Sequence, residues 1–226
     1  MTEGRSFVTR ATQAEHRNRL IVDVLLEHAH AERRAVEHAL LIVDMPFPSF
    51  HLGTHRAIEN AGRILKESRC QAVKLEGGVV MAATIAKLVQ VGIPVMGHIG
   101  LTPQSVHSFG GYKIQGKDKR RREAVLRDAL AVEEAGAFSV VLEGMPLDLA
   151  REITERLAIP TIGIGAGVNC DGQVLVIHDM LGLFDDFRPK FVKRYAELKN
   201  VINAAVKNFI NEVREEEFPG EEHSFK

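Results

Sequence analysis

The chain has 226 residues, of which 45% are hydrophobic and 26% charged, and its formal net charge is −1. This composition is typical of a globular protein with one sizeable core, and the near-neutral balance of charge does not favour nucleic-acid or membrane-surface binding. No apolar run reaches the roughly 18 residues of a membrane-spanning helix. Cys70 and Cys170 lie far apart, not at metal-type spacing, and no secretory apolar segment is present. We therefore expect a cytoplasmic protein with free thiols.

The first 38 residues are harder to interpret than the rest of the chain. Residues 1–19 are polar and give no strand signal. Residues 20–26 are short and β-branched, and are ambiguous between strand and helix, whereas residues 28–38 are rich in Ala, Glu and Arg and favour helix. We predict a mostly helical N-terminal segment, 1–38, followed by a (β/α) barrel domain, 39–226.

From residue 39 onward, apolar runs alternate with helical patterns. The predicted strands are 40–43, 72–75, 94–99, 138–142, 161–164 and 173–177. The predicted helices are 54–68, 81–89, 120–135 and 147–157, with helical segments continuing to residue 214. A basic, irregular loop covers residues 109–119; it is either a solvated surface or an attractor for an anionic cofactor tail.

This alternation predicts a parallel sheet. The fold class that fits is α/β, a (β/α)8 TIM barrel whose chemistry lies at the carboxyl ends of the strands. The barrel is expected to be incomplete, because the pattern gives six strands, or seven if residues 20–26 form one. A doubly wound open sheet is the alternative, but that fold gathers ligand groups at one switch point, and here separate strands end in acids.

Acidic residues end three of the predicted strands, namely Asp44, Glu76 and Glu143. Asp44 and Glu76 follow adjacent strands, so their carboxylates can converge as oxygen ligands of Mg²⁺. Such a metal would polarise a carbonyl or chelate an α-keto acid and so ease enolate formation. The alternative for each acid is a structural role, capping a loop N–H.

Three further side chains have both a functional and a structural interpretation. Lys74 shares a face with Glu76, so it can hold a substrate carboxylate or an enolate oxygen, or form only a salt bridge to Glu76. Glu143, across the pocket, is a candidate general base. His98 is placed to bind substrate or metal-bound water, or is a satisfied interior histidine. The glycines of residues 163–167 fit either a phosphate cradle or close backbone packing.

Several long motifs resemble one family, ketopantoate hydroxymethyltransferase (3-methyl-2-oxobutanoate hydroxymethyltransferase). The resemblance runs in unbroken order from about residue 39 to the C-terminus. Its motifs are Asp-Met-Pro-Phe at 44–47, Lys-Leu-Glu-Gly-Gly at 74–78, Gly-His-Ile-Gly-Leu-Thr-Pro-Gln at 97–104, Gly-Gly-Tyr-Lys-Ile-Gln-Gly at 110–116, Val-Leu-Glu at 141–143, and residues 159–183.

The resemblance implies a barrel of the phosphoenolpyruvate mutase/isocitrate lyase type and a transferase of pantothenate biosynthesis. The family transfers a hydroxymethyl group from 5,10-methylenetetrahydrofolate to 3-methyl-2-oxobutanoate, giving 2-dehydropantoate, with Mg²⁺ holding the keto acid, and it forms homo-oligomers. By motif, Asp44 and Glu76 match metal ligands, Asp44 also touching the keto acid. Lys74 matches a substrate-binding lysine, and Glu143 the general base.

One family feature is absent from this sequence. Family members carry a Val-Gly-Asp-Ser motif ahead of the Asp-Met-Pro-Phe strand, and its aspartate is another metal ligand. Here residues 22–26 resemble the start of that strand but continue into Glu27-His28. We expect that about one βα unit and the first strand are missing and that metal binding is weakened, unless Asp23 or Glu27 supplies a ligand.

Two alternative functions follow. The first is an impaired or inactive member that acts only as an association partner. The second is a carbon–carbon lyase for another α-keto or 2-hydroxy acid, against which the long matches at 97–104 and 110–116 argue.

Overall fold

The computed structural model describes residues 7–8, 21–105, 111, 113–184 and 188–225. The chain divides into two compact units, residues 1–174 and 175–226, and each is described by itself. The separation of residues 1–38 from a barrel domain at 39–226 stays a prediction.

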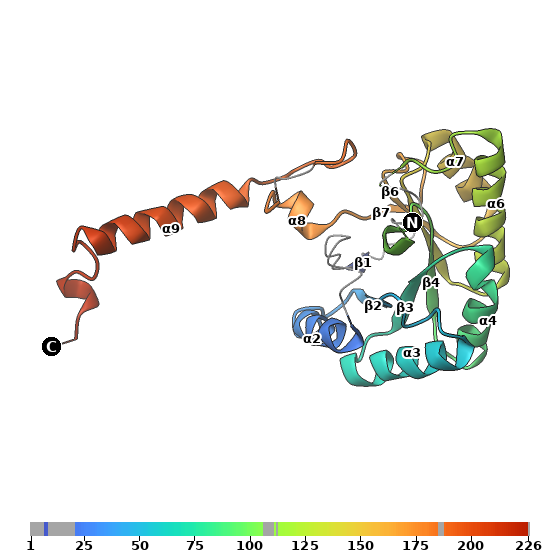
Figure 1. Ribbon diagram of the computed structural model, residues 1–226, viewed down its shortest axis with the longest axis horizontal. Helices are drawn as coiled ribbons and strands as arrows, with labels where there is room; N and C mark the ends of the chain where they lie inside the picture. Colours follow the sequence, from blue (N-terminus) through green and yellow to red (C-terminus); the bar gives the residue numbers. More distant parts are fainter. Residues whose placement is uncertain (1–6, 9–20, 106–110, 112, 185–187, 226) are drawn as a thin grey trace. The chain divides into compact units, whose positions relative to one another are not determined.

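The first unit is built on one parallel sheet (Figure 1). Its strands pair in chain order, each parallel to the next. Within the described residues no pairing returns from the last strand to the first, so the sheet is open. The prediction of an α/β parallel barrel left incomplete is confirmed. The strands are β1 Phe7–Val8, β2 Leu40–Asp44, β3 Ala72–Glu76, β4 Val95–Gly100, β5 Ser139–Glu143, β6 Thr161–Ile164 and β7 Gly172–Gln173.

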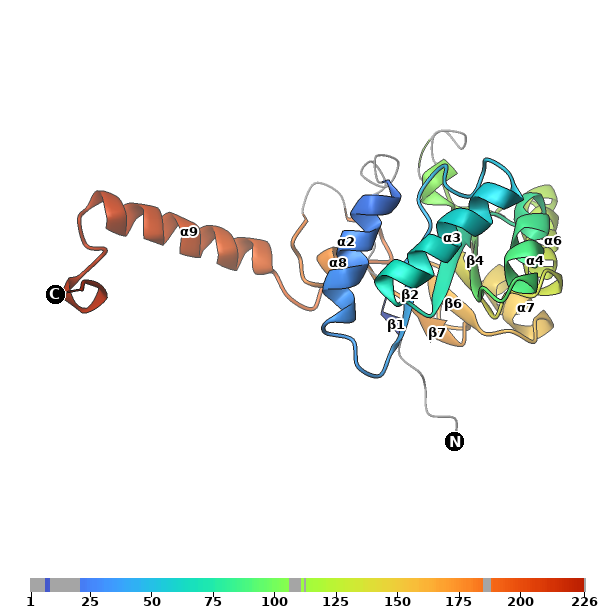
Figure 2. The same cartoon turned by 90° about the horizontal axis from the view of Figure 1, so that it is seen from below.

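Helices connect the strands and cover one side of the sheet, as Figures 1 and 2 show for α3, α4 and α6. A parallel sheet requires such crossovers, because each strand must start at the same end as its neighbour. The helices of this unit are α2 Val22–Arg33, α3 Thr54–Ser68, α4 Ala82–Gln90, α6 Lys119–Glu134 and α7 Leu147–Arg156. Short 3-10 helices, η1 Val79–Met81 and η2 Pro103–Ser105, follow β3 and β4.

The structure decides one ambiguity of the sequence and corrects the interpretation at two other places. Residues 22–26, ambiguous between strand and helix, begin helix α2, because Leu26 and Ala29, three residues apart, bury one helical face. The polar segment 1–19, which gives no strand signal, contains β1, which is only two residues long and too short for a readable pattern. The last strand ends at Gln173 instead of Ile177, and Ile177 begins helix α8 (Ile177–Met180).

The two faces of the sheet have different compositions. Alternate residues of β2 to β5 point toward the helices and join the larger hydrophobic cluster. The opposite, inner face carries a smaller apolar cluster, formed by Ile42, Ala72, Met96, Val141, Ile162 and Ile164. Two residues beyond Ile42, Ala72, Met96 and Val141 on this inner face come Asp44, Lys74, His98 and Glu143. The inner face is therefore apolar in the middle of these four strands and charged at their carboxyl ends.

The central strand β4 packs very closely on helix α6. A Cβ added to Gly97 would lie 2.4 Å from Cγ1 of Val132, a distance that real Cβ contacts do not reach. Glycine is therefore required here by the approach of α6 and not by backbone conformation. Because Gly97 precedes His98, this packing also fixes the strand that carries the site histidine.

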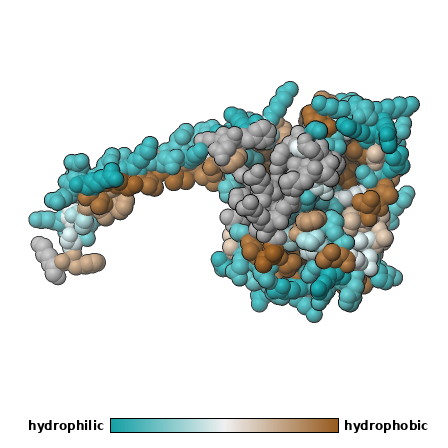
Figure 3. All heavy atoms as spheres, in the orientation of Figure 1, coloured by the Kyte–Doolittle hydropathy of each residue, from teal (hydrophilic) through white to brown (hydrophobic). Residues whose placement is uncertain are grey.

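The second unit contains α8, the long helix α9 (Leu198–Arg214) and a 3-10 helix, η3 (Glu221–His223). The backbone N–H of Tyr195 donates to the carbonyl oxygen of Met180, and the Phe209 and Phe218 rings meet edge to face with centroids 5.5 Å apart. An apolar row runs along α9 (Figure 3) and is exposed, consisting of Val201, Ile202, Val206, Phe209, Ile210 and Val213. Among the described residues, no helix is long and apolar enough to cross a membrane.

The contact between β4 and α6 gives the first prediction. Gly97→Ala should lower the free energy of unfolding by about 1–3 kcal/mol, because the new methyl group forces α6 away from the sheet. Gly62→Ala is the matched control: Gly62 lies inside α3 with nothing within 4 Å of the added Cβ, so alanine should stabilise by about 0.5–1 kcal/mol. Urea unfolding measures both. Equal effects of the two substitutions would contradict the packing argument.

Candidate active site

The carboxyl ends of β2 to β5 bring the five predicted site residues to one face of the sheet. The strand register places Asp44 beside Lys74 and Glu76 beside His98, while Glu143 ends β5 next to Gly100. All five side chains extend from the inner face, because they occupy alternate positions of parallel strands. The structure thus brings these residues together, and their individual roles stay predictions.

Lys74 lies at the centre of the cluster. Its side chain is only 9% exposed, and its Nζ lies 2.8 Å from Oδ1 of Asp44. The same nitrogen lies 3.3 Å from Nδ1 of His98. A buried ammonium needs such partners, since leaving it unpaired away from water is costly. The expected alternative of a salt bridge to Glu76 alone is wrong, because the closest carboxylate belongs to Asp44.

His98 lies between Lys74 and Glu143. An ammonium has only donors, so Nδ1 of His98 accepts from Lys74 and the ring proton is on Nε2. That Nε2 faces Oε2 of Glu143 at 3.0 Å, while Nδ1 lies 3.7 Å from Oε1 of Glu76. His98 is 2% exposed. The imidazole thus lies between the Lys74 ammonium and the Glu143 carboxylate, and its buried Nε2 makes no hydrogen bond within the described residues.

Glu76 is buried, and one of its two carboxylate oxygens accepts a backbone hydrogen bond. Its Oε2 accepts a hydrogen bond of 2.9 Å from the backbone N–H of Gln104. Burial raises the pKa of the Glu76 carboxyl above its ordinary value and the negative charge of Asp44 adds to the rise, while the Lys74 ammonium and the hydrogen bond from Gln104 oppose it. The two carboxylates are thus close enough to repel one another.

The charges of the cluster do not balance. Three carboxylates, Asp44, Glu76 and Glu143, face one ammonium, that of Lys74. With His98 neutral and all three acids ionised, negative charge is in excess. Such a site favours a cation, and the two carboxylates on adjacent strands are the hard oxygen donors that Mg²⁺ prefers. The donor set therefore fits a divalent ion whose remaining ligands would be supplied by water and substrate.

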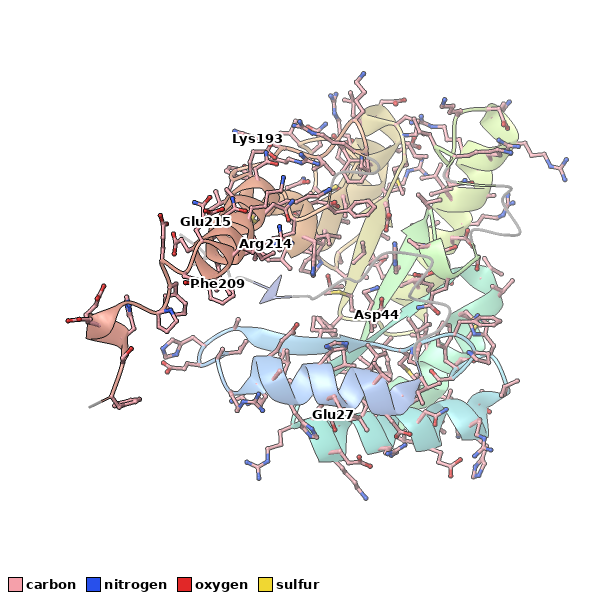
Figure 4. The ribbon with its side chains drawn as sticks, turned by 60° about the vertical axis from the view of Figure 1, so that its left-hand side comes forward. Glu27, Asp44, Lys193, Phe209, Arg214 and Glu215 are labelled. Atoms are coloured by element: carbon pink, nitrogen blue, oxygen red, sulfur yellow. The ribbon has the colours of Figure 1, made fainter. Side chains whose placement is uncertain are left out.

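The carboxylates do not by themselves form a complete metal-binding cluster. Among the residues that the structure describes, no group of three or more His, Cys, Asp or Glu side chains is arranged to hold a metal ion. Asp23 does not supply the missing ligand, because it pairs with Arg63 of α3 at 2.6 Å. Glu27 is exposed on α2, and Figure 4 shows it apart from Asp44.

The loop that follows Glu76 is anchored from helix α6. Oδ1 of Asp128 accepts a hydrogen bond of 2.9 Å from the backbone N–H of Val79. A Cβ on Gly78 would lie 2.1 Å from Cβ of Asp128, so this contact requires glycine. Burial raises the pKa of the Asp128 carboxyl above its ordinary value. Asp128 therefore fixes the turn that leaves β3 directly after the site residues.

Sequence reasoning assigned no role to Gln104 or Asp128. Gln104 stands at the end of a motif that supported the family resemblance, but a neutral side chain in a loop carries no chemical signal of its own. Asp128 lies inside a helix rich in charged residues, where nothing distinguishes it from its exposed neighbours. The glycines at 163–167 fit close packing, since a Cβ on Gly163 would lie 2.9 Å from Sγ of Cys170 and one on Gly167 would lie 2.6 Å from Cβ of Leu147.

The sequence of this chain is similar to those of one family of known proteins. The family model for ketopantoate hydroxymethyltransferase matches residues 4–221. A 3-methyl-2-oxobutanoate hydroxymethyltransferase of Geobacter sulfurreducens is 56% identical over 214 residues, covering 94% of this chain and 80% of the relative. One of Syntrophotalea carbinolica is 54% identical over 211 residues, with 93% and 79% covered, and one of Paracoccus denitrificans is 55% identical over 204 residues, with 90% and 74% covered.

A solved structure supports the fold alone. QR15, an aldolase, superposes with a TM-score of 0.50 at 12% identity, covering 76% of this chain and 92% of that one.

The half-buried Asp128 carboxyl gives a prediction on pH dependence. Because its pKa is raised on folding, its contribution to stability is present at low pH and is lost as the pH rises above about 4. Asp128→Asn keeps the acceptor for Val79 and removes the charge, so its stability relative to wild type should increase from pH 4 to 7 in urea unfolding.

Asp148 is the control of opposite sign. The hydrogen bond from Arg122 lowers the pKa of the Asp148 carboxyl. The contribution of Asp148 to stability is therefore present above the ordinary pKa of an aspartate, about 4, and is lost as the pH falls below it. Asp148→Asn should become less stable than wild type as the pH rises. Parallel pH profiles for the two variants would contradict the assignment of burial as the cause at Asp128.

Proposed function

Because the chain belongs to the ketopantoate hydroxymethyltransferase family, we propose that it transfers a hydroxymethyl group from 5,10-methylenetetrahydrofolate to 3-methyl-2-oxobutanoate. The observation that carries the proposal is the buried cluster of Asp44, Lys74, Glu76, His98 and Glu143 at the carboxyl ends of adjacent parallel strands. It combines a base, a cation and two possible metal ligands on one face.

The first chemical requirement is removal of the proton at C3 of the keto acid. Glu143 is the proposed general base. Its carboxylate extends from the end of β5 and is 12% exposed at the side chain, so it is largely screened from water. Nε2 of His98 lies 3.0 Å from Oε2 of this carboxylate, and we propose that a carboxylate oxygen takes the substrate proton.

The second requirement is stabilisation of the negative charge that develops on the enolate oxygen. The Lys74 ammonium is the proposed electrostatic partner of that oxygen or of the substrate carboxylate. Asp44 and His98 hold this ammonium at 2.8 and 3.3 Å, so its position is set before substrate binds. A preorganised charge costs little reorganisation during the reaction.

Asp44 and Glu76 are the residues that would hold Mg²⁺, and Asp44 is proposed to touch the keto acid as well. When bound, the ion would polarise the keto group and favour its enolate. The excess negative charge of the cluster and the mutual repulsion of the two carboxylates support this assignment. His98 is proposed to bind substrate or metal-bound water, and its buried Nε2, which makes no hydrogen bond within the described residues, supports this role.

The overall reaction balances with water. A bond forms between C3 of the enolate and the one-carbon unit, the bonds of that carbon to the folate nitrogens break, and water supplies the hydroxyl oxygen. The products are tetrahydrofolate and 2-dehydropantoate, a precursor of pantothenate. The α-keto acid and the folate are thus the proposed small-molecule partners.

The names of the curated relatives favour an active transferase over a subunit that serves only association. The absence of a Val-Gly-Asp-Ser motif leaves two proposed carboxylate ligands, so we expect weaker metal binding than a third acid would give. We also propose a cytoplasmic homo-oligomer. The exposed apolar row on α9 supports the oligomer, because subunit interfaces cover such surfaces.

The role of Glu143 can be tested without folate. In deuterium oxide with Mg²⁺, the wild-type protein should exchange the C3 proton of 3-methyl-2-oxobutanoate, which proton NMR follows directly. Glu143→Gln should slow exchange by about 10²- to 10⁴-fold, because the base is lost while the shape is kept. Glu155→Gln, on the exposed surface of α7, should exchange at the wild-type rate. Rapid exchange by Glu143→Gln would assign the base elsewhere.

The complete reaction tests the function and the metal together. The purified chain should form 2-dehydropantoate only when both 5,10-methylenetetrahydrofolate and Mg²⁺ are present, and EDTA should abolish product formation until excess Mg²⁺ is added. Mass spectrometry of the product measures this. Turnover unaffected by EDTA would refute the assignment of Asp44 and Glu76 as metal ligands, and no turnover under any condition would refute the proposed function.

A further inference from the structure

Gln104 connects the two strands that carry the proposed metal ligands. It lies in η2, just after β4, and is 7% exposed. Its backbone N–H donates to Oε2 of Glu76 at 2.9 Å. Its side-chain Nε2 donates to the carbonyl oxygen of Met45, also at 2.9 Å, and Met45 directly follows Asp44. One residue thus contacts both the Glu76 carboxylate and the backbone next to Asp44.

These contacts determine how the side-chain amide is oriented. The Met45 carbonyl can only accept, so the nitrogen of the amide must face it and Oε1 must face away. Oε1 is buried and has no hydrogen-bond partner in the described part of the chain. An unsatisfied buried acceptor is costly. The two hydrogen bonds that Gln104 donates, to Glu76 and to Met45, must offset this cost.

The remaining contacts join the same two strand ends. The backbone N–H of Met45 donates to the carbonyl oxygen of Lys74 at 2.8 Å. Met45 is therefore fixed by β3 through its nitrogen and by Gln104 through its oxygen. Glu76 is fixed through one carboxylate oxygen, while its Oε1 is directed toward His98.

We propose that Gln104 is a positioning residue that holds the Asp44 and Glu76 carboxylates at the separation needed to share a divalent cation. This inference rests on the proposed function, since it presupposes that the two acids bind Mg²⁺. Two repelling carboxylates would otherwise separate in the metal-free protein. Fixing them in advance lowers the reorganisation required when the ion binds.

The test measures metal affinity without substrate. Gln104→Met keeps the volume and the backbone N–H but removes the donor to Met45. Its affinity for Mn²⁺, used as a paramagnetic probe of the Mg²⁺ site and followed by electron paramagnetic resonance, should fall by roughly 10- to 100-fold. Keto-acid proton exchange should then recover at high Mg²⁺, because the base and the lysine are unchanged.

Gln71→Met is the matched control. The Gln71 side chain also bonds to the backbone of β2, accepting from Leu41 N–H at 2.8 Å, but at the amino end of the strands. It should change thermal stability while leaving Mn²⁺ affinity at the wild-type value, which separates a local effect on the site from a general loss of strand contacts.

Three outcomes decide the inference. Weakened binding by Gln104→Met alone, in a protein that melts cooperatively, supports it. Binding by Gln104→Met within about twofold of wild type overturns it and leaves the proposed function intact. Wild-type protein that binds no Mn²⁺ overturns the metal assignment itself and the inference with it.

Discussion

The buried ammonium of Lys74 is the constraint on which the site depends. It lies on the inner face of the sheet at 9% exposure, where Asp44 and His98 contact it at 2.8 and 3.3 Å and offset the cost of burying it. Those partners exist because parallel strands in register bring the same end of each strand to one edge. The fold and the charge cluster therefore require each other: the sheet supplies the partners, and their pairing lets polar residues occupy an otherwise apolar face.

Much of this arrangement could be predicted from the sequence. The acids that end separate apolar runs predicted that charged side chains meet at one edge of the sheet, and the alternation of Lys74 with Leu75 and Glu76 predicted a shared face. Helix α3 has its predicted limits, because its apolar residues repeat at helical spacing over the whole segment. The sequence predicted an element well wherever a long run of regularly spaced apolar residues indicated one buried face.

The remaining features depend on contacts between distant residues, which a linear pattern does not carry. Residues 22–26 suit a strand by composition, but Leu26 and Ala29 pack as one helical face, and this tertiary contact decides the outcome. The pairing of Lys74 with Asp44 instead of Glu76 follows from strand register. Gln104 carries no charge and gives no periodic signal, so its contacts with both neighbouring strands emerge only from the three-dimensional structure.

The sheet, and not the loops, sets the positions of the reactive groups. Backbone hydrogen bonds continue one residue past the site positions: Met45 N–H donates to the Lys74 carbonyl at 2.8 Å, Gly77 N–H to that of His98 at 2.9 Å, and Leu101 N–H to that of Glu143 at 2.8 Å. Each functional side chain therefore stands on backbone that is still bonded to its neighbour when the loop begins. Side chains on regular elements are held more precisely than those on loops. The sheet thus maintains the distances between the Lys74 ammonium and the carboxylates around it.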